Sequence, residues 1–398
     1  MSLCSVRNIK RFVLNRFDKF FRYYLKKEEI KKFRDPRRVA IHSTVSLTDE
    51  QKNAIDKVYL ENYGKKIPHT WHKHFTAYTG KFDPYYFPEL LFIPAFEKIM
   101  NNNANYATAF SDKAVLPLVA SSEQVDIKMP RILISSACNL FRNQDNTILS
   151  REEAIEIMSS LGEVFVKPST DSSSGKKCMK LNMNNGIDEL TGRTAEEIFV
   201  ELGSNFVVQE CIKCHSSIRA VYPDSVNTFR IITYVWRDNV EHMPIIMRIG
   251  QKGAYVDNAH AGGMFIAVSD DGTLHQKAFT EFKKEFVQHP DTGLVFEGHR
   301  IENMADVIAA AKRIHQAIPQ IGCVNWDFTI DEEGAPVLIE ANINGGSIWM
   351  AEMAHGCGVF GERTPEVLQW VRLCESIPKT ERYKYAYGRI TPKGEIKS

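Results

Sequence analysis

Three oxygen-bearing side chains in the last quarter of the chain have the types and spacing of a metal site. The segment VNWDFTIDEEGAPVLIEANI, residues 324–343, predicts a β-hairpin with its turn at residues 331–334. Glu340 and Asn342 are two positions apart, so they share one face of their strand, and Asp327 comes roughly opposite them on the other strand. Two carboxylates and an amide suit Mg²⁺, which also takes phosphate oxygens and waters. A hairpin whose acidic residues simply face water is the alternative.

A lysine followed by a serine- and glycine-rich loop forms a second cluster. Lys167 ends the predicted strand EVFVKPS, and the loop PSTDSSSGKK follows it. Such a loop can turn backbone N–H groups and hydroxyls toward phosphate oxygens, while Lys167 and Lys176 supply positive charge. The loop residues concerned are Ser172, Ser173, Ser174 and Gly175. A plain flexible connection is the alternative for the loop alone, but the lysines, the loop and the acidic hairpin together indicate a nucleotide and its metal.

The stretch Cys211-Ile212-Lys213-Cys214-His215 matches the C-x-x-C-H pattern of covalent haem attachment. That attachment takes place outside the cytoplasm, and the start MSLCSVRNIKRF has neither the apolar core nor the small-residue cleavage site of a secretory signal. A zinc site would need a second ligand pair at finger-like spacing. The eight cysteines, scattered over 398 residues, fit reduced thiols. We therefore interpret the pair as thiols without a redox role.

Composition and charge indicate a soluble, cytoplasmic globular protein. Apolar residues make up 43% and charged residues 25% of the chain, and no run of 18 apolar residues occurs. Residues 1–38 carry thirteen Lys and Arg against four Asp and Glu, whereas the rest of the chain is net acidic. This balance argues against a nucleic-acid partner for the protein as a whole.

Within the basic segment, apolar residues recur at helical spacing: Ile9, Val13, Phe17, Phe20 and Tyr24. A basic helix with an aromatic face can make peripheral contact with an anionic membrane, here the inner membrane face. It can equally pack on the body of the protein with its charges solvated. Both interpretations remain open at this point.

The organisation along the chain predicts an α+β fold. Residues 46–110 are mostly helical in pattern, and short strands alternate with helices from about residue 111. Ser150 and Thr194 are predicted to open helices, the first of them closed by Gly162. Residues 227–250 predict two antiparallel strands joined at residues 237–239. The strands are expected to be mostly antiparallel, with helices on one face.

With these lysines, loops and acidic residues in this order, the sequence resembles the ATP-grasp superfamily. Within it, the sequence is most similar to the sugar-transfer-associated ATP-grasp family, whose members are sometimes named hexapeptide transferases. The segments that carry the resemblance are VKPSTDSSSG, VVQECI, SVNTFRIITY, RIGQKGAYVDNAHAGG, HPDTG and VNWDFTIDEEGAPVLIEANINGG, over about residues 111–350. The resemblance implies an ATP-grasp fold, in which two α+β subdomains grip ATP, here after an N-terminal helical region. It also implies Mg²⁺ as the metal.

The resemblance assigns roles to individual residues. The hinge between the subdomains, with backbone groups that bind adenine, would be Gln209, Glu210, Cys211 and Ile212. Lys113 and Lys167 would contact the phosphates under the loop 171–176, and Glu210 or a nearby acid would hold the ribose. Arg230 and Arg248, with Lys176, are the catalytic candidates that would hold carboxylate and phosphoryl oxygens.

Weaker candidates lie around these residues. Asp257, Asn258 and the pair Gly262-Gly263 would form an acceptor loop, and Asn227 would order the adjoining loop. Three histidines, at positions 215, 260 and 289, are candidate bases, although a lone histidine is more often structural.

The implied reaction is the ATP-dependent joining of a carboxylate to an amine through an acyl phosphate. The family label points to an acidic sugar of a cell-surface polysaccharide or its lipid-linked precursor as substrate. One departure matters, because Asn325 stands where many ATP-grasp ligases have an arginine, two residues before the first metal carboxylate. A kinase that phosphorylates a hydroxyl and a nucleotide-binding scaffold without turnover are therefore the alternatives.

The expected domain boundaries follow from this organisation. We expect a basic amphipathic segment over residues 1–45, a helical region over 46–110, the ATP-grasp domain over 111–375 and a C-terminal tail over 376–398.

Overall fold

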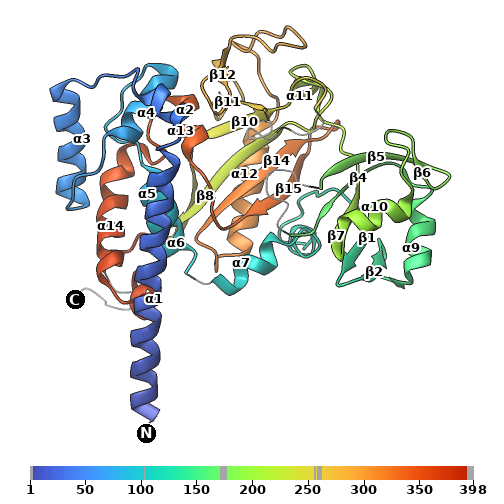
Figure 1. The fold of residues 1–398 in the computed structure, drawn as a ribbon, viewed down its shortest axis with the longest axis horizontal. Helices are drawn as coiled ribbons and strands as arrows, with labels where there is room; N and C mark the ends of the chain where they lie inside the picture. Colours follow the sequence, from blue (N-terminus) through green and yellow to red (C-terminus); the bar gives the residue numbers. More distant parts are fainter. Residues whose placement is uncertain (1–2, 103, 171–176, 255–256, 258–261, 392–398) are drawn as a thin grey trace.

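The structure is a computed structural model that describes residues 3–102, 104–170, 177–254, 257 and 262–391, with side chains from residue 11 onward except that of residue 104. Figure 1 shows three parts side by side: a layer of helices at the left, a large sheet in the centre and a smaller lobe at the right. Strand pairing within both sheets is antiparallel among the described residues, which confirms the predicted α+β class.

The smaller lobe is a seven-stranded sheet with the order β3-β2-β1-β7-β4-β5-β6. Its elements are β1 (Ile132–Ala137), β2 (Leu140–Asn143), β3 (Ile148–Leu149), α9 (Arg151–Met158), β4 (Gly162–Pro168), β5 (Met179–Asn184), β6 (Ile187–Asp188), α10 (Ala195–Leu202) and β7 (Asn205–Glu210). Alternate residues of β4 and β7, such as Val164, Val166 and Val208, are buried with Phe199 of α10 in one core. The opposite face of β4 and β7 therefore carries Lys167, Phe165 and Gln209.

The capping predictions for the lobe are confirmed at both helix starts. Ser150 and Thr194 each accept a hydrogen bond from the backbone three residues on, and Glu153 and Glu197 complete the two capping boxes. The predicted closure at Gly162 is wrong. Helix α9 ends at the cap residue Ser159, and Gly162, with φ of +68°, is already the first residue of β4.

The large sheet has the order β13-β12-β11-β10-β8-β14-β15, with β9 paired to β8 as well. Its strands are β8 (Thr228–Trp236), β9 (Asn239–His242), β10 (Ile245–Ile249), β11 (Met264–Val268), β12 (Leu274–Phe279), β13 (Glu285–Phe286), β14 (Cys323–Ile330) and β15 (Pro336–Asn342). Helix α12 (Met304–Ala317) covers one face and buries Val307, Ala311 and Ile314 against it. The short helices α7 (Ala104–Ser111), α8 (Leu116–Ala120) and α11 (Ser216–Arg219) lie around this sheet.

The expected pair of strands over residues 227–250 consists of three strands. Strand β9 pairs with the end of β8, and β10 pairs with its beginning. The break between them contains Pro244, which has no N–H to donate to the ladder. The turn between β8 and β9 lies at Arg237 and Asp238, where Arg237 has a φ of +55°.

Helices also cover part of the other face of the large sheet, contrary to the expectation of helices on one face. The layer contains α2 (Pro36–His42), α3 (Asp49–Asn62), α4 (Thr70–Thr79), α5 (Glu89–Leu91), the π-helix η1 (Phe92–Glu97), α6 (Lys98–Met100), α13 (Trp349–His355), α14 (Thr364–Ser376) and the 3₁₀ helices η4 (Gly361–Arg363) and η5 (Lys379–Tyr385). It shares one core with the sheet residues Ile232, Tyr234, Trp236 and Ile246. Segments from both ends of the chain therefore pack together, and the domain boundaries expected from the sequence stay predictions.

The long first helix α1 (Leu3–Lys32) packs on the body, but through its polar side. Asp18 and Arg22 are buried, and Arg22 donates to Glu375 of α14. The predicted apolar face is exposed from Val13 onward, including Phe17 and Phe20. In the described part of the chain, none of the helices combines the length and the apolar character needed to cross a membrane.

Asn101, just after α6, ties the helical layer to the hairpin β14–β15. Its Nδ2 donates to the carbonyl oxygens of Cys323 and Ile343 at 2.8 and 2.7 Å, and its Oδ1 accepts from the N–H groups of Gly322 and Cys323. The side chain is only 2% exposed. These four hydrogen bonds hold both ends of the hairpin on one residue.

We predict that Asn101→Ala lowers the free energy of unfolding by about 2–4 kcal/mol, because it leaves buried backbone groups without partners. All five tryptophans lie outside the smaller lobe, so their fluorescence during urea denaturation reports on the body that contains Asn101. Asn239→Ala, at an exposed position of β9, is the matched control and should shift stability by less than about 0.5 kcal/mol. Equal shifts for the two variants would contradict this role of Asn101.

Candidate functional site

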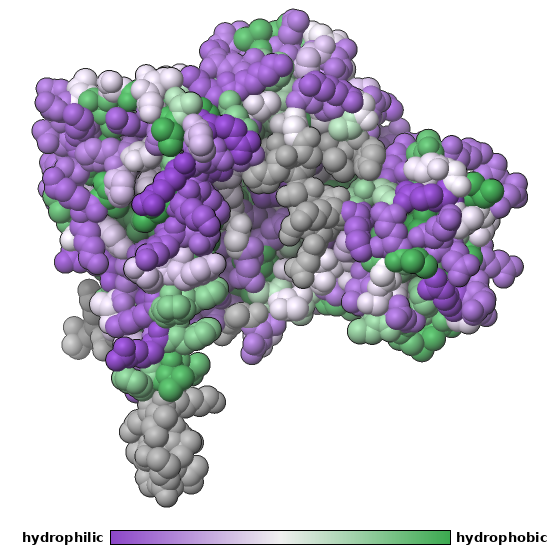
Figure 2. All heavy atoms as spheres, viewed as in Figure 1, coloured by the Kyte–Doolittle hydropathy of each residue, from purple (hydrophilic) through white to green (hydrophobic). Residues whose placement is uncertain are grey.

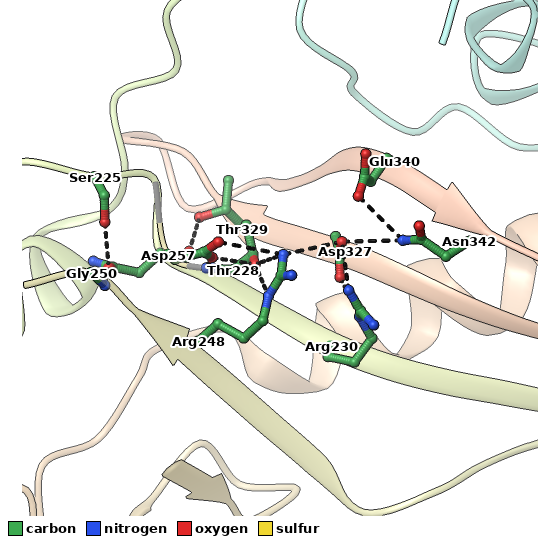
Figure 3. Close-up of polar contacts among 11 residues, drawn as sticks. Ser225, Thr228, Arg230, Arg248, Gly250, Asp257, Asp327, Thr329, Glu340 and Asn342 are labelled. Carbon is green, nitrogen blue, oxygen red and sulfur yellow. Dashed lines mark hydrogen bonds and ion pairs between the residues drawn. The ribbon is translucent and has the colours of Figure 1, made fainter. Parts of the chain in front are cut away.

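The hairpin β14–β15 brings the three predicted metal ligands together. Asp327 pairs directly with Glu340, and Asn342 pairs with Asn325. Asn342 Nδ2 lies 3.3 Å from both Asp327 Oδ2 and Glu340 Oε1. Figure 3 shows these three side chains converging on one patch of the sheet. The predicted hairpin, its turn and its facing acids are confirmed.

Asp327 is completely buried and is paired with two arginines, one on the adjacent strand β8 and one on β10, the next strand beyond β8. Arg230 of β8 binds it through both carboxylate oxygens, with Nε 2.5 Å from Oδ1 and Nη2 3.1 Å from Oδ2. Arg248 of β10 contributes a third contact, with Nη2 3.1 Å from Oδ2. Such bidentate, charge-assisted pairs are among the strongest polar contacts in proteins. The two predicted catalytic arginines therefore lie at the centre of the candidate site.

Arg248 extends this network to Asp257. Its guanidinium lies 3.5 Å from Asp257 Oδ1 and donates to the Thr228 hydroxyl, which itself donates to Asp257 Oδ2. Burial alone would lower the pKa of Arg248, but the carboxylates of Asp257 and Asp327 raise it above its ordinary value. Burial raises the pKa of Asp257, and Arg248 partly offsets this. Arg248 therefore stays charged at any physiological pH.

Two lysines approach the hairpin from the side of the smaller lobe. Lys113 lies between α7 and α8, its backbone N–H donates to Ser169 just after β4, and its Nζ is 3.4 Å from Glu340 Oε2. Burial lowers the pKa of Lys167 to about 8, although the Glu340 charge raises it. For Glu340 the balance is reversed: burial raises its pKa, but Lys113 and Lys167 hold it well below its usual range. Both lysines therefore act electrostatically on the predicted metal ligand.

The predicted hinge links the two sheets. Gln209 is buried in β7, paired with both β1 and β4, and its side chain lies 3.4 Å from the Pro130 carbonyl oxygen. Glu210 ends the strand, and its carboxylate accepts from the Arg131 N–H. Cys211 and Ile212 follow, partly exposed, and the backbone of Cys214 forms an isolated antiparallel β-bridge with that of Asp331, the residue directly after β14. Residues 209–214 therefore lead from the smaller sheet toward the large one, and Lys167 lies opposite Val207, two residues before Gln209.

Part of the predicted site lies outside the described residues. These positions are Ser172, Ser173, Ser174, Gly175 and Lys176 of the phosphate loop, and Asn258 and His260 of the acceptor loop.

Two of the three candidate histidine bases have structural contacts instead. His215 Nδ1 caps α11 by accepting from the Ser217 N–H. His289 is fully buried, with Nε2 2.9 Å from the Gly250 carbonyl oxygen and Nδ1 accepting from the Asp291 N–H. Asn227 is also buried and orders its loop, because its amide donates to the Tyr222 carbonyl and accepts from Ser225.

The donor set fits a magnesium ion. Asn342 places its amide nitrogen between two carboxylates, where a cation would be stabilised, and a rotation of the amide would present its oxygen instead. No cluster of three or more His, Cys, Asp or Glu side chains suited to a metal occurs within the described ranges. Asp327, Glu340 and Asn342 would fill only part of the octahedral coordination of Mg²⁺. The remaining positions would be open to phosphate oxygens and waters, as Mg²⁺ prefers.

Sequence reasoning missed the contacts that hold the loop after the hairpin. Glu97 of η1 is buried, and its two oxygens accept from the N–H groups of Gly345 and Gly346 at 2.9 and 2.7 Å. Burial raises the pKa of Glu97 to about 8. Asn325 is fully buried against Gly346, and no hydrogen bond to its amide is formed in the described structure. Glu97 lies some 250 positions from its partners, so no local pattern could reveal it.

Comparison with known families now identifies the fold. Residues 94–367, more than half of the chain, match the family model "Sugar-transfer associated ATP-grasp". The chain belongs to this family. At the level of the family, this confirms the predicted recognition, the ATP-grasp enzyme fold, and ATP with Mg²⁺ as its cofactors.

Solved structures show a more distant likeness. The L-amino acid ligase from Bacillus licheniformis has 15% identity and a TM-score of 0.37, over 67% of this chain and 48% of that chain. The D-alanine–D-alanine ligase from Bacillus anthracis has 16% identity and a TM-score of 0.36, over 67% and 68% of the two chains. An ADP complex of N5-carboxyaminoimidazole ribonucleotide synthetase has 11% identity and a TM-score of 0.35, over 60% and 46%. The chain thus spans about half the length of the first of these, and no curated protein sequence matches it.

We predict that the affinity of this ATP-grasp protein for ATP falls as the pH rises through about 8. Lys167 loses its proton in this range, so it no longer attracts phosphate oxygens, and binding must then take up a proton. Calorimetric titration with ATP between pH 7 and 9 measures the effect. Lys167→Met should bind ATP at least about tenfold more weakly with a flatter pH profile.

Lys277→Met, which removes a half-buried lysine of β12 that pairs with Glu285 of β13, is the control for this titration and should behave as wild type. An unchanged pH profile in Lys167→Met would show that Lys167 does not face the phosphates.

Proposed function

We propose that this protein is an ATP- and Mg²⁺-dependent ligase that joins a carboxylate to an amine through an acyl phosphate. The observation that supports this most directly is the cluster of four cationic side chains around the hairpin acids Asp327 and Glu340. The acids face Lys113 and Lys167 on the lobe side, and Arg230 and Arg248 lie beside them on the sheet. This arrangement suits a polyphosphate and a carboxylate held next to each other.

The proposed reaction has two steps. In the first, an oxygen of the substrate carboxylate attacks the γ-phosphorus of ATP, the bond from that phosphorus to the bridging oxygen breaks, and ADP leaves. In the second, the amine nitrogen attacks the acyl carbon, phosphate leaves, and the nitrogen gives up a proton. Bound Mg²⁺ would neutralise charge on the phosphate oxygens. The chain itself would supply the cationic side chains and the relative position of the two substrates.

In this proposal Lys113 and Lys167 bind the phosphates, while Arg230 and Arg248 bind the substrate carboxylate and the transferred phosphoryl group. This role of Arg230 is supported by its bidentate ion pair with Asp327, which brings the guanidinium from β8 to a proposed metal ligand. Arg230 can therefore take over the role of the arginine that many ATP-grasp ligases carry where this chain has Asn325. The hinge at Gln209 to Ile212 would hold the adenine, and Glu210 the ribose.

The proposed carboxylate is an acidic sugar of a cell-surface polysaccharide or of its lipid-linked precursor. The family name links these proteins to sugar transfer, which favours such a substrate. A lipid-linked precursor would also place the protein in the cytoplasm, close to the inner membrane face.

Trapping with hydroxylamine tests the ligase reaction. The protein, ATP, Mg²⁺ and a uronic acid should yield a hydroxamate, because hydroxylamine captures an acyl phosphate in place of the amine. A stable phosphoester would instead establish a kinase. ATP binding without ADP release, across a panel of sugar acids and amines, would establish a scaffold.

We predict that Asp327→Asn and Glu340→Gln each reduce ADP release by at least about 10²-fold, because each removes a charged ligand from the proposed metal site. Measuring the rate as a function of Mg²⁺ concentration tests the assignment, and tryptophan fluorescence checks the fold. Glu332→Gln changes an exposed acid in the turn of the same hairpin and should leave the rate unchanged. Near-normal ADP release by folded Asp327→Asn would refute the metal assignment.

A further inference from the structure

Helix α1 has its polar and apolar sides arranged in the reverse of the usual order for a surface helix. A helix that packs on a globular body normally buries its apolar stripe and exposes its charges. Here Asp18, Arg22 and Glu29 are between 3% and 6% exposed, whereas Phe12, Phe17 and Phe20 are between 60% and 67% exposed. Phe21 and Leu25, at the edge of the apolar side, are partly buried, but Phe12, Phe17 and Phe20 remain largely exposed in the described structure.

Ion pairs anchor the buried side. Asp18 accepts from Arg22 in the same helix and from Arg382 of η5 at 2.8 Å, and both arginines are buried with it. Arg22 and Lys26 also lie 2.9 Å from Glu375 of α14. Because these contacts join α1 to the C-terminal helices, its orientation on the body is determined by the polar side. The aromatic side is thereby held outward.

The outward side combines aromatic and basic residues. We define the outer face of α1 as Phe12, Val13, Arg16, Phe17, Phe20, Tyr23, Tyr24 and Lys27, all of them exposed. Arg16 lies 5.3 Å from the Phe12 ring centroid, and Lys27 lies 4.9 Å from that of Tyr23. Two of the four acids in residues 1–38, Asp18 and Glu29, are buried in ion pairs, so the accessible charge of this segment is almost wholly positive.

The position of α1 makes this face accessible. Figure 1 shows the N-terminal half of the helix extending beyond the body, away from both sheets, and Figure 2 shows apolar residues gathered where it emerges. With about 1.5 Å per residue, a 30-residue helix is roughly 45 Å long. A flat partner could therefore contact several turns at once.

We propose that the outer face of α1 docks the protein on an anionic membrane surface. Aromatic side chains would enter the boundary between headgroups and acyl chains, and Arg16 and Lys27 would pair with anionic headgroups. A second copy of this chain is the less suitable partner, because two outer faces would bring like charges together. This proposal extends beyond the ligase reaction and does not depend on it.

Flotation with vesicles tests the proposal on the full chain. Wild-type protein should float with vesicles of phosphatidylcholine and phosphatidylglycerol in equal amounts, and should stay at the bottom with phosphatidylcholine alone. The combined variant Phe12→Ser, Phe17→Ser and Phe20→Ser should bind the anionic vesicles at least about tenfold more weakly, because three apolar side chains no longer leave water. Arg16→Glu with Lys27→Glu should weaken binding similarly and reduce its salt dependence.

The matched control is Leu118→Ser with Val200→Ser, which removes two apolar side chains that are 70% and 68% exposed elsewhere on the surface. This variant should float like wild type. Equal flotation of the triple-serine variant and wild type would overturn the proposal. The proposal would also be overturned if wild type did not float and if sedimentation showed that wild type is a dimer whereas the triple-serine variant is a monomer. Thermal unfolding of each variant confirms that its fold is intact, and neither outcome depends on ligase activity.

Discussion

The architecture of the site depends on the burial of a single carboxylate, that of Asp327. A buried charge costs several kcal/mol unless partners compensate it, so the strands around it must supply cations at fixed positions. Arg230 on β8 and Arg248 on β10 do so, and Asp327 therefore sets the relative positions of three strands. Removal of either arginine would leave charge uncompensated in the interior. The same geometry presents guanidinium groups beside a pair of acids, which is the charge pattern that phosphoryl transfer needs.

The helical layer has a direct connection to this centre. Asn101 holds both ends of the hairpin, and Glu97 holds the two glycines that follow it. Both residues come from a helix that continues through Pro94 as a π-helix, a geometry often found at functional sites. The match to the family begins at residue 94 and so includes them. The layer thus supports the hairpin that carries the proposed metal ligands.

Helix α1 shows that hydrophobic pattern alone does not decide which side of a helix packs. Its apolar residues have the spacing of a core-facing stripe, yet the body offers Glu375 and Arg382 at the contact surface. At this contact surface Glu375 pairs with Arg22 and Arg382 pairs with Asp18, in addition to the Asp18–Arg22 pair within the helix, so the polar side is the one that packs. The aromatic side of α1 therefore faces away from the body and is exposed.

Local patterns in the sequence determined the elements and part of the site. Capping boxes act over three residues and strand alternation over two, so the helices opened by Ser150 and Thr194 and the facing pair Asp327 and Glu340 could be predicted. Only the tertiary structure decided which strands lie beside the hairpin, and hence that Arg230, 97 positions away, would pair with Asp327. It also decided the contacts of Glu97 and the orientation of α1. The physical reason is that hydrogen bonds and ion pairs between distant segments depend on how whole layers pack. Short-range periodicity in the sequence contains no information on that packing.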